Sequence, residues 1–592
     1  MSEETGTIVL RSAETGGWRT FQRPREIVIA RRPADVLPGL RYLEAAVQER
    51  RLHAAGLVSY EAAPGFDPAL RVQASEDFPL LWFGLYDGFH EAAGLPPAGR
   101  AEQPLDWTPS VSRREYDLAL QRIRDRIRAG DTYQVNYSYR LRARFELEPW
   151  SWFLHLAARA GAAHAAYLDL GRWAVCCASP ELFFRVRDGT LLARPMKGTA
   201  ARGRTVQEDD QAAARLQGSA KDRAENVMIV DMIRSDVGKV AAPGSVQVPR
   251  LCEVERYPTV LQMTSTVTAR VSAPLGEVMR ALFPCASVTG APRVRTMEII
   301  AEVESAPRGL YTGSVGHLAP DGERPAGMFN VAIRTAVVDR GSASAEYGVG
   351  GAILWDSDAA EEYRESEIKA RVLRAPAWTP GTELLEALLW TPAEGWFLLD
   401  RHLARMSESA RYFGIPFDDA AARLALDREA AGLAAGPLGG QPHKVRLVLD
   451  SSGAASVSSQ PLEAIARSPV QRVRLSSFPV RSSEVLLYHK TSRREVFERA
   501  RREHPGCDDV ILWNERGEIT ESCTANVVAE VDGARVTPPV SCGLLAGTFR
   551  AELLRLGEIS ERLLTRRELR ACPSVWLVNS VRRWMPAALL PD

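Results

Sequence analysis

The sequence predicts an α+β protein with at least two domains, because 592 residues are too many for one hydrophobic core. Short apolar runs typical of buried strands, such as Leu80–Tyr86, alternate with segments that carry helix-capping signals. A proline-rich break follows near Arg374, and the pattern of strands and helices then starts again. We therefore expect a first domain over residues 1–372, a linker over 373–381 and a second domain over 382–592.

Composition argues against several classes of function. Basic and acidic residues are equal in number, 74 of each, so no net field would recruit nucleic acid or an anionic membrane surface. The first residues carry no basic and apolar signal pattern, and no apolar run is long enough to span a bilayer. The eight cysteines show no metal-binding spacing. Reduced core thiols in a cytoplasmic protein are the expected reading.

Two helices frame the first domain. Ser112, with Glu115 three residues on, predicts a capping box and a helix that Gly130 ends. The strongest helical signal covers residues 219–238, where Val227–Ile233 are apolar nearly all round and are expected to be buried.

Lys197 and Glu181 are the first candidates for chemistry. Lys197 lies between Pro195 and Gly198, and such an amine is either a solvated surface charge or a desolvated nucleophile. Glu181 follows Ser179-Pro180 and precedes Leu182-Phe183; it is either a general acid whose pKa is raised by burial or a strand-end carboxylate in solvent.

Acidic side chains on two helices are candidate ligands for a hard cation. Glu225 lies in the first turns of the 219–238 helix, where a favourable helix-dipole interaction is the alternative. Glu362, Glu365 and Lys369 share one face of a later helix, which could also be a solvated, salt-bridged surface. If the two helices face each other, Glu225, Glu362 and Glu365 would form an oxygen-rich Mg²⁺ site.

Several later residues are candidates for binding an anion. Ser287 and Thr289 stand at a turn entering a helix, where free N–H groups would favour negative charge. Arg334 is expected inside an apolar strand, 330–335, and so needs a carboxylate partner, either from a ligand or from the protein.

Taken in order, these motifs resemble the chorismate-binding enzyme family. The match runs from Ser179-Pro180-Glu181 and Arg194–Thr199 through the 219–238 helix to Gly348–Ala352. The resemblance implies a β-sandwich with helices, like anthranilate synthase component I, a Mg²⁺-dependent activity and chorismate as substrate. It makes Glu181 the acid and Lys197 the nucleophile. It also implies that the substrate is bound by Ser287, Thr289, Tyr311, Arg334, Gly350, Gly351 and Lys369.

The positions where this chain departs from the family pattern narrow the choice of reaction. Water-adding members carry a lysine base where this chain has Gln134, and an amide cannot deprotonate water. Anthranilate-forming members carry alanine at the place of Lys197 and histidine at that of Gln262, so amination para to the ring carboxylate is favoured. The effects of Gln262, Ser235 and Ala352, which also depart from the family pattern, stay open.

The second domain carries a separate set of motifs: Tyr488–Arg494, Gly517–Asn526, Leu544–Arg550 and Val578–Arg583. Together they resemble the class IV, fold-type IV pyridoxal-phosphate enzymes, which have a two-subdomain α/β fold. The resemblance implies that Lys490 carries pyridoxal 5'-phosphate and moves protons, and that Glu521 binds the pyridine nitrogen. Arg405 and the Gly547–Thr548 backbone would hold the phosphate.

The two resemblances together imply a bifunctional enzyme of the folate pathway. Chorismate and ammonia would give 4-amino-4-deoxychorismate, and loss of pyruvate would then give 4-aminobenzoate. No Gly-x-Cys-x-Gly motif is present, so a separate glutamine amidotransferase subunit is expected to supply the ammonia. A homodimer through the second domain is also expected. The alternatives are a second domain that transaminates branched-chain or D-amino acids, an anthranilate synthase-like activity, and a first domain that binds chorismate for regulation without turnover.

Overall fold

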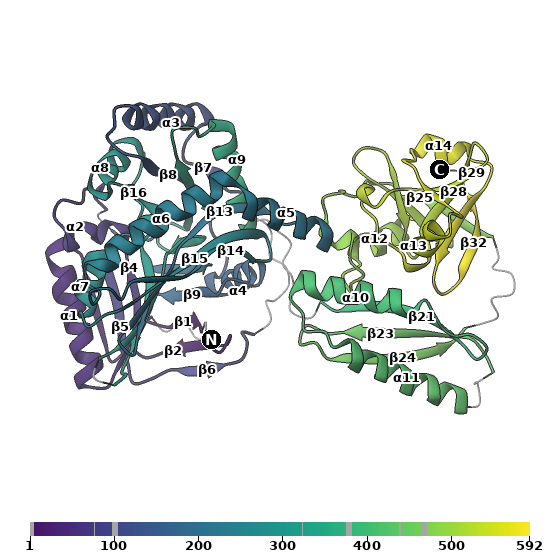
Figure 1. Cartoon of the computed structure of the whole chain (residues 1–592), viewed down its shortest axis with the longest axis horizontal. Helices are drawn as coiled ribbons and strands as arrows, with labels where there is room; N and C mark the ends of the chain where they lie inside the picture. The colour runs from purple at the N-terminus through teal and green to yellow at the C-terminus, as the bar shows by residue number, and fades with distance from the viewer. Residues whose placement is uncertain are drawn as a thin grey trace. The chain divides into compact units, whose positions relative to one another are not determined.

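The computed structural model describes residues 5–12, 14–75, 77–96, 105–322, 324–373, 382–436, 440–462 and 470–591. The predicted linker, 373–381, lies outside the described residues except for Leu373. The chain forms two compact units, of which the first contains Met1–Arg202 and Ala212–Thr379 and the second contains Gly203–Gln211 and Pro380–Asp592 (Figure 1). Among the described residues, no helix combines the length and apolar character needed to cross a membrane.

The first unit is built on two ten-stranded antiparallel sheets. The first sheet runs in the order β16 (Gly290–Ala291), β8 (Gln134–Arg144), β20 (Ser344–Ile353), β19 (Thr335–Asp339), β10 (Trp173–Ser179), β9 (His164–Asp169), β1 (Ile8–Arg11), β2 (Trp18–Phe21) and β6 (His90–Ala92), with β7 (Thr108–Pro109) beside β8. The second runs β13 (Met196–Ala201), β15 (Val260–Arg270), β12 (Thr190–Arg194), β11 (Leu182–Arg187), β18 (Ala326–Asn330), β17 (Ser314–Ala319), β4 (His53–Val58), β5 (Leu81–Tyr86) and β3 (Glu26–Ala30), with β14 (Gln247–Arg256) beside β15.

The two sheets share one apolar core, which confirms the predicted β-sandwich with helices. Leu168 and Val175 of the first sheet are buried together with Leu57 and Trp82 of the second. Removing apolar side chains of both sheets from water stabilises their face-to-face packing.

Helices cover the outer faces of the sandwich. The second sheet is covered by α1 (Pro33–Glu49), α6 (Ala220–Gly238) and α7 (Leu275–Leu282), which Figure 1 shows running across it. The first sheet packs against α3 (Arg113–Arg128), α4 (Pro149–Ala160), α8 (Arg293–Val303) and α9 (Ala359–Ala370). Two further helices of the chain's first 220 residues are α2 (Ala63–Phe66) and α5 (Val206–Gly218).

The structure confirms the helix signals and corrects one burial pattern. Ser112 and Glu115 form the predicted capping box of α3. At the start of α6, the Ser219 hydroxyl accepts a hydrogen bond from the backbone N–H of Asp222. The expectation that α6 is buried all round is wrong: Ile229 is fully buried, whereas Val227 is 40% exposed, because α6 packs one face against the sheet and turns the other to solvent.

The second unit contains two sheets, as a two-subdomain fold requires. A four-stranded sheet runs β22 (Gly395–Phe397), β21 (Leu384–Thr391), β23 (His443–Leu449) and β24 (Ala455–Pro461). An eight-stranded sheet runs β27 (Ile519–Ser522), β26 (Asp509–Trp513), β25 (Gln471–Leu475), β32 (Arg583–Leu589), β31 (Val575–Asn579), β28 (Asn526–Val531), β29 (Ala534–Thr537) and β30 (Ser560–Glu561). An additional pairing of β27 with β28 closes part of this sheet on itself.

The described residues from 382 onward contain the α-helices α10 (Leu399–Phe413), α11 (Asp419–Ala435), α12 (Glu495–Glu503), α13 (Thr548–Arg555) and α14 (Arg566–Ala571). The predicted hairpin after residue 384 is present as β21 and β22, which pair antiparallel. The amphipathic helix predicted from His402 is α10, with Leu403, Met406 and Ala410 buried.

Candidate active site

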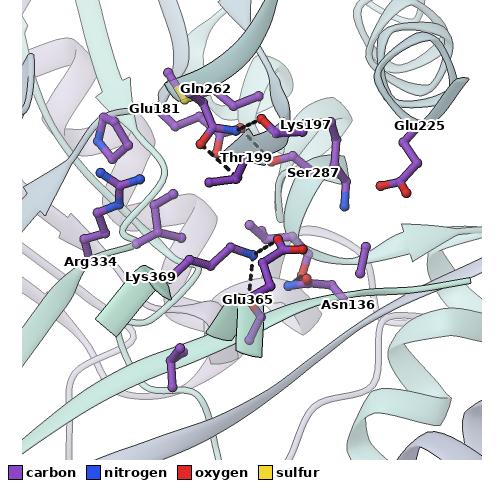
Figure 2. Close-up of a pocket in the computed structure, with 18 of the residues that line it drawn as sticks. Asn136, Glu181, Lys197, Thr199, Glu225, Gln262, Ser287, Arg334, Glu365 and Lys369 are labelled. Carbon is purple, nitrogen blue, oxygen red and sulfur yellow. Dashed lines mark hydrogen bonds and ion pairs between the residues drawn. The ribbon is translucent and has the colours of Figure 1, made fainter. Parts of the chain in front are cut away.

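A polar cavity of about 230 Å³ lies at one end of the first unit's sandwich. Side chains reach it from β8, β13, β15, β20, α6 and α9, so residues more than 200 positions apart meet in one place (Figure 2). The cavity brings together Glu181, Lys197, Glu225, Ser287, Arg334, Glu362, Glu365 and Lys369, all of which the sequence singled out.

Lys197 enters this cavity from β13. Burial lowers the pKa of its amine, and the nearby carboxylate of Glu225 offsets part of that effect. Gly198, the next residue, has φ = +91°, a conformation that favours glycine. A Cβ atom there would lie 3.1 Å from the side chain of Asp222, so any other residue would require Asp222 to shift. These observations agree with the desolvated-amine reading rather than with a surface charge.

Glu181 is a buried carboxyl group on the other side of the cavity. It is only 2% exposed, and desolvation raises its pKa to about 7. The Ser287 hydroxyl donates a hydrogen bond of 2.7 Å to Glu181 Oε1, which orients the carboxyl group. A group with this pKa holds a proton for a large part of the time near neutral pH and can give it to a leaving group.

Three carboxylates and one lysine form the acidic wall of the cavity. Desolvation raises the pKa values of Glu225 and Glu362, and the charge of Glu365 adds to both shifts. Glu365 is instead held below its usual pKa range by Lys369, whose amine lies 2.7 Å from the Glu365 carboxylate. The alternative of a solvated helix face therefore does not describe α9 on this side.

This wall fits Mg²⁺ as a partial site. Among the described residues, no group of three acidic, histidine or cysteine side chains is close enough to hold a metal alone. Mg²⁺ commonly takes one or two protein carboxylates and completes its shell with water and substrate oxygens. The desolvated carboxylates of Glu225 and Glu362, each repelled by the charge of Glu365, suit that arrangement.

Glycines of β20 bring its backbone close to neighbouring groups at the cavity. The Lys369 amine donates a hydrogen bond of 2.9 Å to the carbonyl of Gly350. A Cβ on Gly351 would lie 3.5 Å from Glu362 Oε2, so this residue faces α9 rather than lining the cavity itself. A Cβ on Gly348 would overlap the ring of Tyr311, which is buried and lines the cavity.

The backbone at Arg334 differs from the predicted strand, but its side chain is buried, as predicted. The strand expected over 330–335 is interrupted between β18 and β19, and Arg334 has φ = +52°. This turn directs a buried side chain to the cavity, where Nη1 has no hydrogen-bond partner within the described part of the chain. The geometry therefore leaves room for a carboxylate from a ligand.

Thr289 does not line the cavity, in contrast to the expectation from sequence. It is fully buried, and its hydroxyl donates to the carbonyl of Cys285. Gln134 is also fully buried and lies outside the cavity lining, and its amide has no hydrogen-bond partner among the described residues.

A second constellation surrounds Lys490 in the second unit. Burial lowers the pKa of the Lys490 amine to about 8, and the adjacent charge of Arg405 acts in the same direction. Burial raises the pKa of Glu521 to about 8, and its Oε1 accepts a hydrogen bond from the backbone N–H of Leu545. Pyridoxal phosphate needs an amine and a partner for its ring nitrogen, and these two residues fit it.

Two buried residues, Glu386 and His402, connect the predicted phosphate-binding residues. The sequence did not indicate this connection. Arg405 makes two hydrogen bonds, of 2.8 and 2.6 Å, to Glu386, and His402 Nδ1 lies 2.6 Å from the same carboxylate. His402 Nε2 lies 3.2 Å from the hydroxyl of Thr548, and Gly547 is the N-cap residue of α13. Arg405, Thr548 and the start of α13 thus converge, as a phosphate site requires.

Burial alone would raise the pKa of Glu386, but the charges of Arg405 and His402 hold it at about 2. Glu386 therefore stays ionised and fixes the Arg405 guanidinium. No sequence signal identified Glu386, because it stands within the apolar strand β21 and meets its partners only when α10 folds back over that strand.

These two clusters have the character of enzyme sites: one is polar and rich in carboxylates, and the other is organised around Lys490. Residues 6–375 match the family described as chorismate binding enzyme, and the chain belongs to that family. Residues 383–590 match the family described as amino-transferase class IV.

Individual relatives point the same way. The chain is 36% identical over 341 residues to "Aminodeoxychorismate synthase component 1" of Klebsiella aerogenes, covering 53% of this chain and 74% of the relative. It is 42% identical over 289 residues to "Aminodeoxychorismate synthase" of Streptomyces griseus, covering 48% of this chain but only 39% of that relative. Anthranilate synthase component I from Streptococcus pneumoniae shares the fold of the first unit, with a TM-score of 0.51 at 23% identity over 63% of this chain and 94% of the other.

Proposed function

We propose that the chain makes 4-aminobenzoate from chorismate and ammonia in two half-reactions, one in each unit. The observation that carries this proposal is the position of Lys197, a desolvated amine in the same cavity as the buried acid Glu181. The match to aminodeoxychorismate synthases and the class IV match of residues 383–590 support it.

In the first half-reaction, Lys197 is the nucleophile and Glu181 the general acid. The neutral Lys197 amine forms a bond to C2 of the chorismate ring, both ring double bonds shift, and the bond between C4 and its hydroxyl breaks as the hydroxyl leaves as water with the proton of Glu181. Ammonia then bonds to C4, both double bonds shift back, the bond between C2 and Lys197 breaks, and the new ammonium group returns its extra proton to the Glu181 carboxylate. After these two substitutions the nitrogen from ammonia is bonded to C4, which lies para to the ring carboxylate.

The substrate carries two carboxylates, and the cavity offers matching cations. The unpartnered Nη1 of Arg334 would receive one of them, and the Lys369 amine, bound to Glu365 and the Gly350 carbonyl, lines the same cavity. Mg²⁺, held by Glu225 and Glu362 with Glu365 nearby, would neutralise substrate charge next to this wall.

In the second half-reaction, pyridoxal phosphate supplies an electron sink to the amine of 4-amino-4-deoxychorismate. Lys490 removes the proton at C4 of the ring, and the bond between C3 and the enolpyruvyl oxygen breaks. Pyruvate leaves and the ring becomes aromatic. Glu521 would bind the pyridine nitrogen of the cofactor, and Arg405 and the Gly547–Thr548 backbone would hold its phosphate.

The nitrogen source and assembly are also proposed. The chain spans about two fifths of the Streptomyces griseus relative, and the Klebsiella relative is called component 1. Together with the absence of a Gly-x-Cys-x-Gly motif from the sequence, this supports a separate glutamine amidotransferase as ammonia donor. None of the eight cysteines forms a disulfide bond, which fits a reducing compartment such as the cytoplasm. A homodimer through the second unit is proposed from the class IV match.

The test is to incubate the purified chain with chorismate, Mg²⁺, pyridoxal phosphate and an ammonium salt, and to separate the products by chromatography. We expect 4-aminobenzoate and pyruvate in equal amounts. Accumulation of 4-amino-4-deoxychorismate alone would reassign the second unit to transamination. Anthranilate would show that the role given to Lys197 is wrong, and binding of chorismate without any product would indicate a regulatory domain.

A further inference from the structure

The strand that carries Lys197 is irregular at that residue. Strand β13 pairs with β15 so that Met196 lies opposite Thr264 and Thr199 lies opposite Gln262. Three steps along β13 therefore correspond to two steps along β15, which is the signature of a β-bulge at Lys197–Gly198. A bulge re-aims side chains, and here it accompanies the entry of Lys197 into the cavity.

A bulge also removes backbone groups from the regular ladder, and buried carbonyls without partners are costly. In this bulge, both carbonyls are bound by side-chain amides. Gln262 Nε2 donates to the Gly198 carbonyl at 2.9 Å, and Asn226 Nδ2 of α6 donates to the Lys197 carbonyl at 3.3 Å. The other end of the Gln262 amide, Oε1, accepts the Thr199 hydroxyl at 3.1 Å. Figure 2 shows Gln262 beside Thr199 and Lys197.

Glutamine suits this place because one planar group supplies a donor and an acceptor side by side. The donor meets a carbonyl and the acceptor meets a hydroxyl of consecutive residues. In a neutral imidazole, the N–H and the lone pair point away from different ring nitrogens in divergent directions, so histidine at position 262 could serve one of the two partners but not bracket both. Gln262 is itself 7% exposed, so water does not readily replace it.

We propose that Gln262 is a positioning residue for Lys197: its amide locks the Lys197–Gly198 bulge and so keeps the amine pointed at the substrate. The kinetic consequence rests on the proposed function, whereas the locking itself does not. Gln262 thereby acts through Lys197, and the glutamine at 262 and the lysine at 197 form a matched pair that favours para amination.

The locking can be tested without turnover by competitive labelling. The chain is acetylated with trace acetic anhydride over a range of pH, and the Lys197 peptide is quantified by mass spectrometry against the peptide of exposed Lys239. Gln262→Met keeps side-chain length but loses both hydrogen bonds. We expect the midpoint of Lys197 labelling to rise toward that of Lys239, because a released bulge lets the amine regain water. Thr199→Val removes one bond and should give a smaller rise.

Gln48→Met is the matched control, because the Gln48 amide also donates to a backbone carbonyl, that of Gly322, but lies far from Lys197 in the fold. It should leave Lys197 labelling unchanged. An unchanged midpoint in both Gln262→Met and Thr199→Val would overturn the proposal. If either variant unfolds, as judged by circular dichroism, the other decides the outcome.

Kinetics then separate this inference from the proposed function. With chorismate and ammonium, Gln262→Met should lower kcat about 10- to 100-fold, with KM for chorismate changed by less than about threefold, because misplacing a nucleophile affects the transition state more than binding. A shifted labelling midpoint without any wild-type turnover would keep the positioning role and sink the proposed function. A normal midpoint with lowered kcat would mean that Gln262 contacts the substrate instead.

Discussion

In the proposed first half-reaction, the Glu181 carboxyl group must be protonated and the Lys197 amine must be neutral before the reaction can start. Glu181, with a pKa raised by burial to about 7, has to be protonated, so its contribution falls as pH rises through 7. Lys197, with a pKa lowered by burial, has to be neutral, so its contribution grows as pH rises through that lowered value. Desolvation is the largest cause of both shifts, and the charge of Lys369 also lowers the pKa of Lys197.

From this follows a bell-shaped pH dependence of kcat for 4-amino-4-deoxychorismate formation, with the descending limb near pH 7. Glu181→Gln should lower the rate about 100-fold and remove that descending limb, since an amide neither donates its proton nor titrates. Initial rates with saturating ammonia across pH 5–9, corrected for the ammonia/ammonium ratio, measure this. A descending limb that persists in Glu181→Gln would assign it to another group.

In the proposed reaction, Lys197 decides which product forms. Lys197→Met should lower 4-amino-4-deoxychorismate formation at least about 100-fold, because it removes the amine that bonds to C2, and the Lys369 amine of the same cavity is held by Glu365 and the Gly350 carbonyl. Lys239→Met, on the exposed end of α6, is the control and should match wild type. Full para amination by Lys197→Met would show that ammonia attacks C4 directly.

Individual site residues could be predicted from the sequence only where they stand in a local motif. Lys197, Glu181 and Glu365 stand in short motifs with turn residues and helical spacing, so they were predictable, and the structure brings them into one cavity. Glu386 and Asn226 have no such signal. Glu386 contacts Arg405 19 residues away, and Asn226 reaches Lys197 29 residues away, so only the packing of a helix on a strand reveals either contact.

Among the elements, α6 has two different tasks on its two faces. Its buried face, with Ile229 and Val230, packs on the second sheet, and its first turns bring Glu225 to the cavity and Asn226 to the Lys197 carbonyl. Its apolar sequence suggested burial on all sides, because a run of apolar residues without clear periodicity does not reveal which face is covered. The predicted strand over 330–335 failed for a related reason: an apolar run does not show a left-handed turn at Arg334.

Because α6 has one buried and one exposed face, two similar substitutions on it should have unequal effects on stability. Ile229→Ala should destabilise the first unit by about 2–5 kcal/mol through loss of buried contacts and a cavity. Val227→Ala, on the same helix two residues earlier, should change it by less than about 0.5 kcal/mol, since Val227 is 40% exposed. The stability of the first unit in both variants is measured in the whole chain, by following hydrogen exchange of the α6 amides as the urea concentration is raised. Equal effects would mean that the outer face of α6 is covered in solution.

At the scale of the whole molecule, each unit has its own hydrophobic core and its own half-buried lysine with a lowered pKa. The first unit's cavity and the Lys490 cluster of the second share no residue. The product of the first site is a stable small molecule in the proposed scheme, so it can in principle pass between chains as well as within one. Two catalytic centres with separate supporting residues should therefore be separable by mutation.

The corresponding experiment mixes two inactive variants. Lys197→Met should make no 4-aminobenzoate from chorismate but should still convert added 4-amino-4-deoxychorismate, and Lys490→Ala should accumulate 4-amino-4-deoxychorismate. An equimolar mixture should restore 4-aminobenzoate formation, with a lag that shortens as the Lys197→Met concentration rises, because the intermediate must diffuse from one chain to the other. Restoration that stays absent while each variant performs its remaining half-reaction would show that the intermediate is withheld from solution. Restoration without a lag would indicate that the two variants exchange it within a mixed assembly.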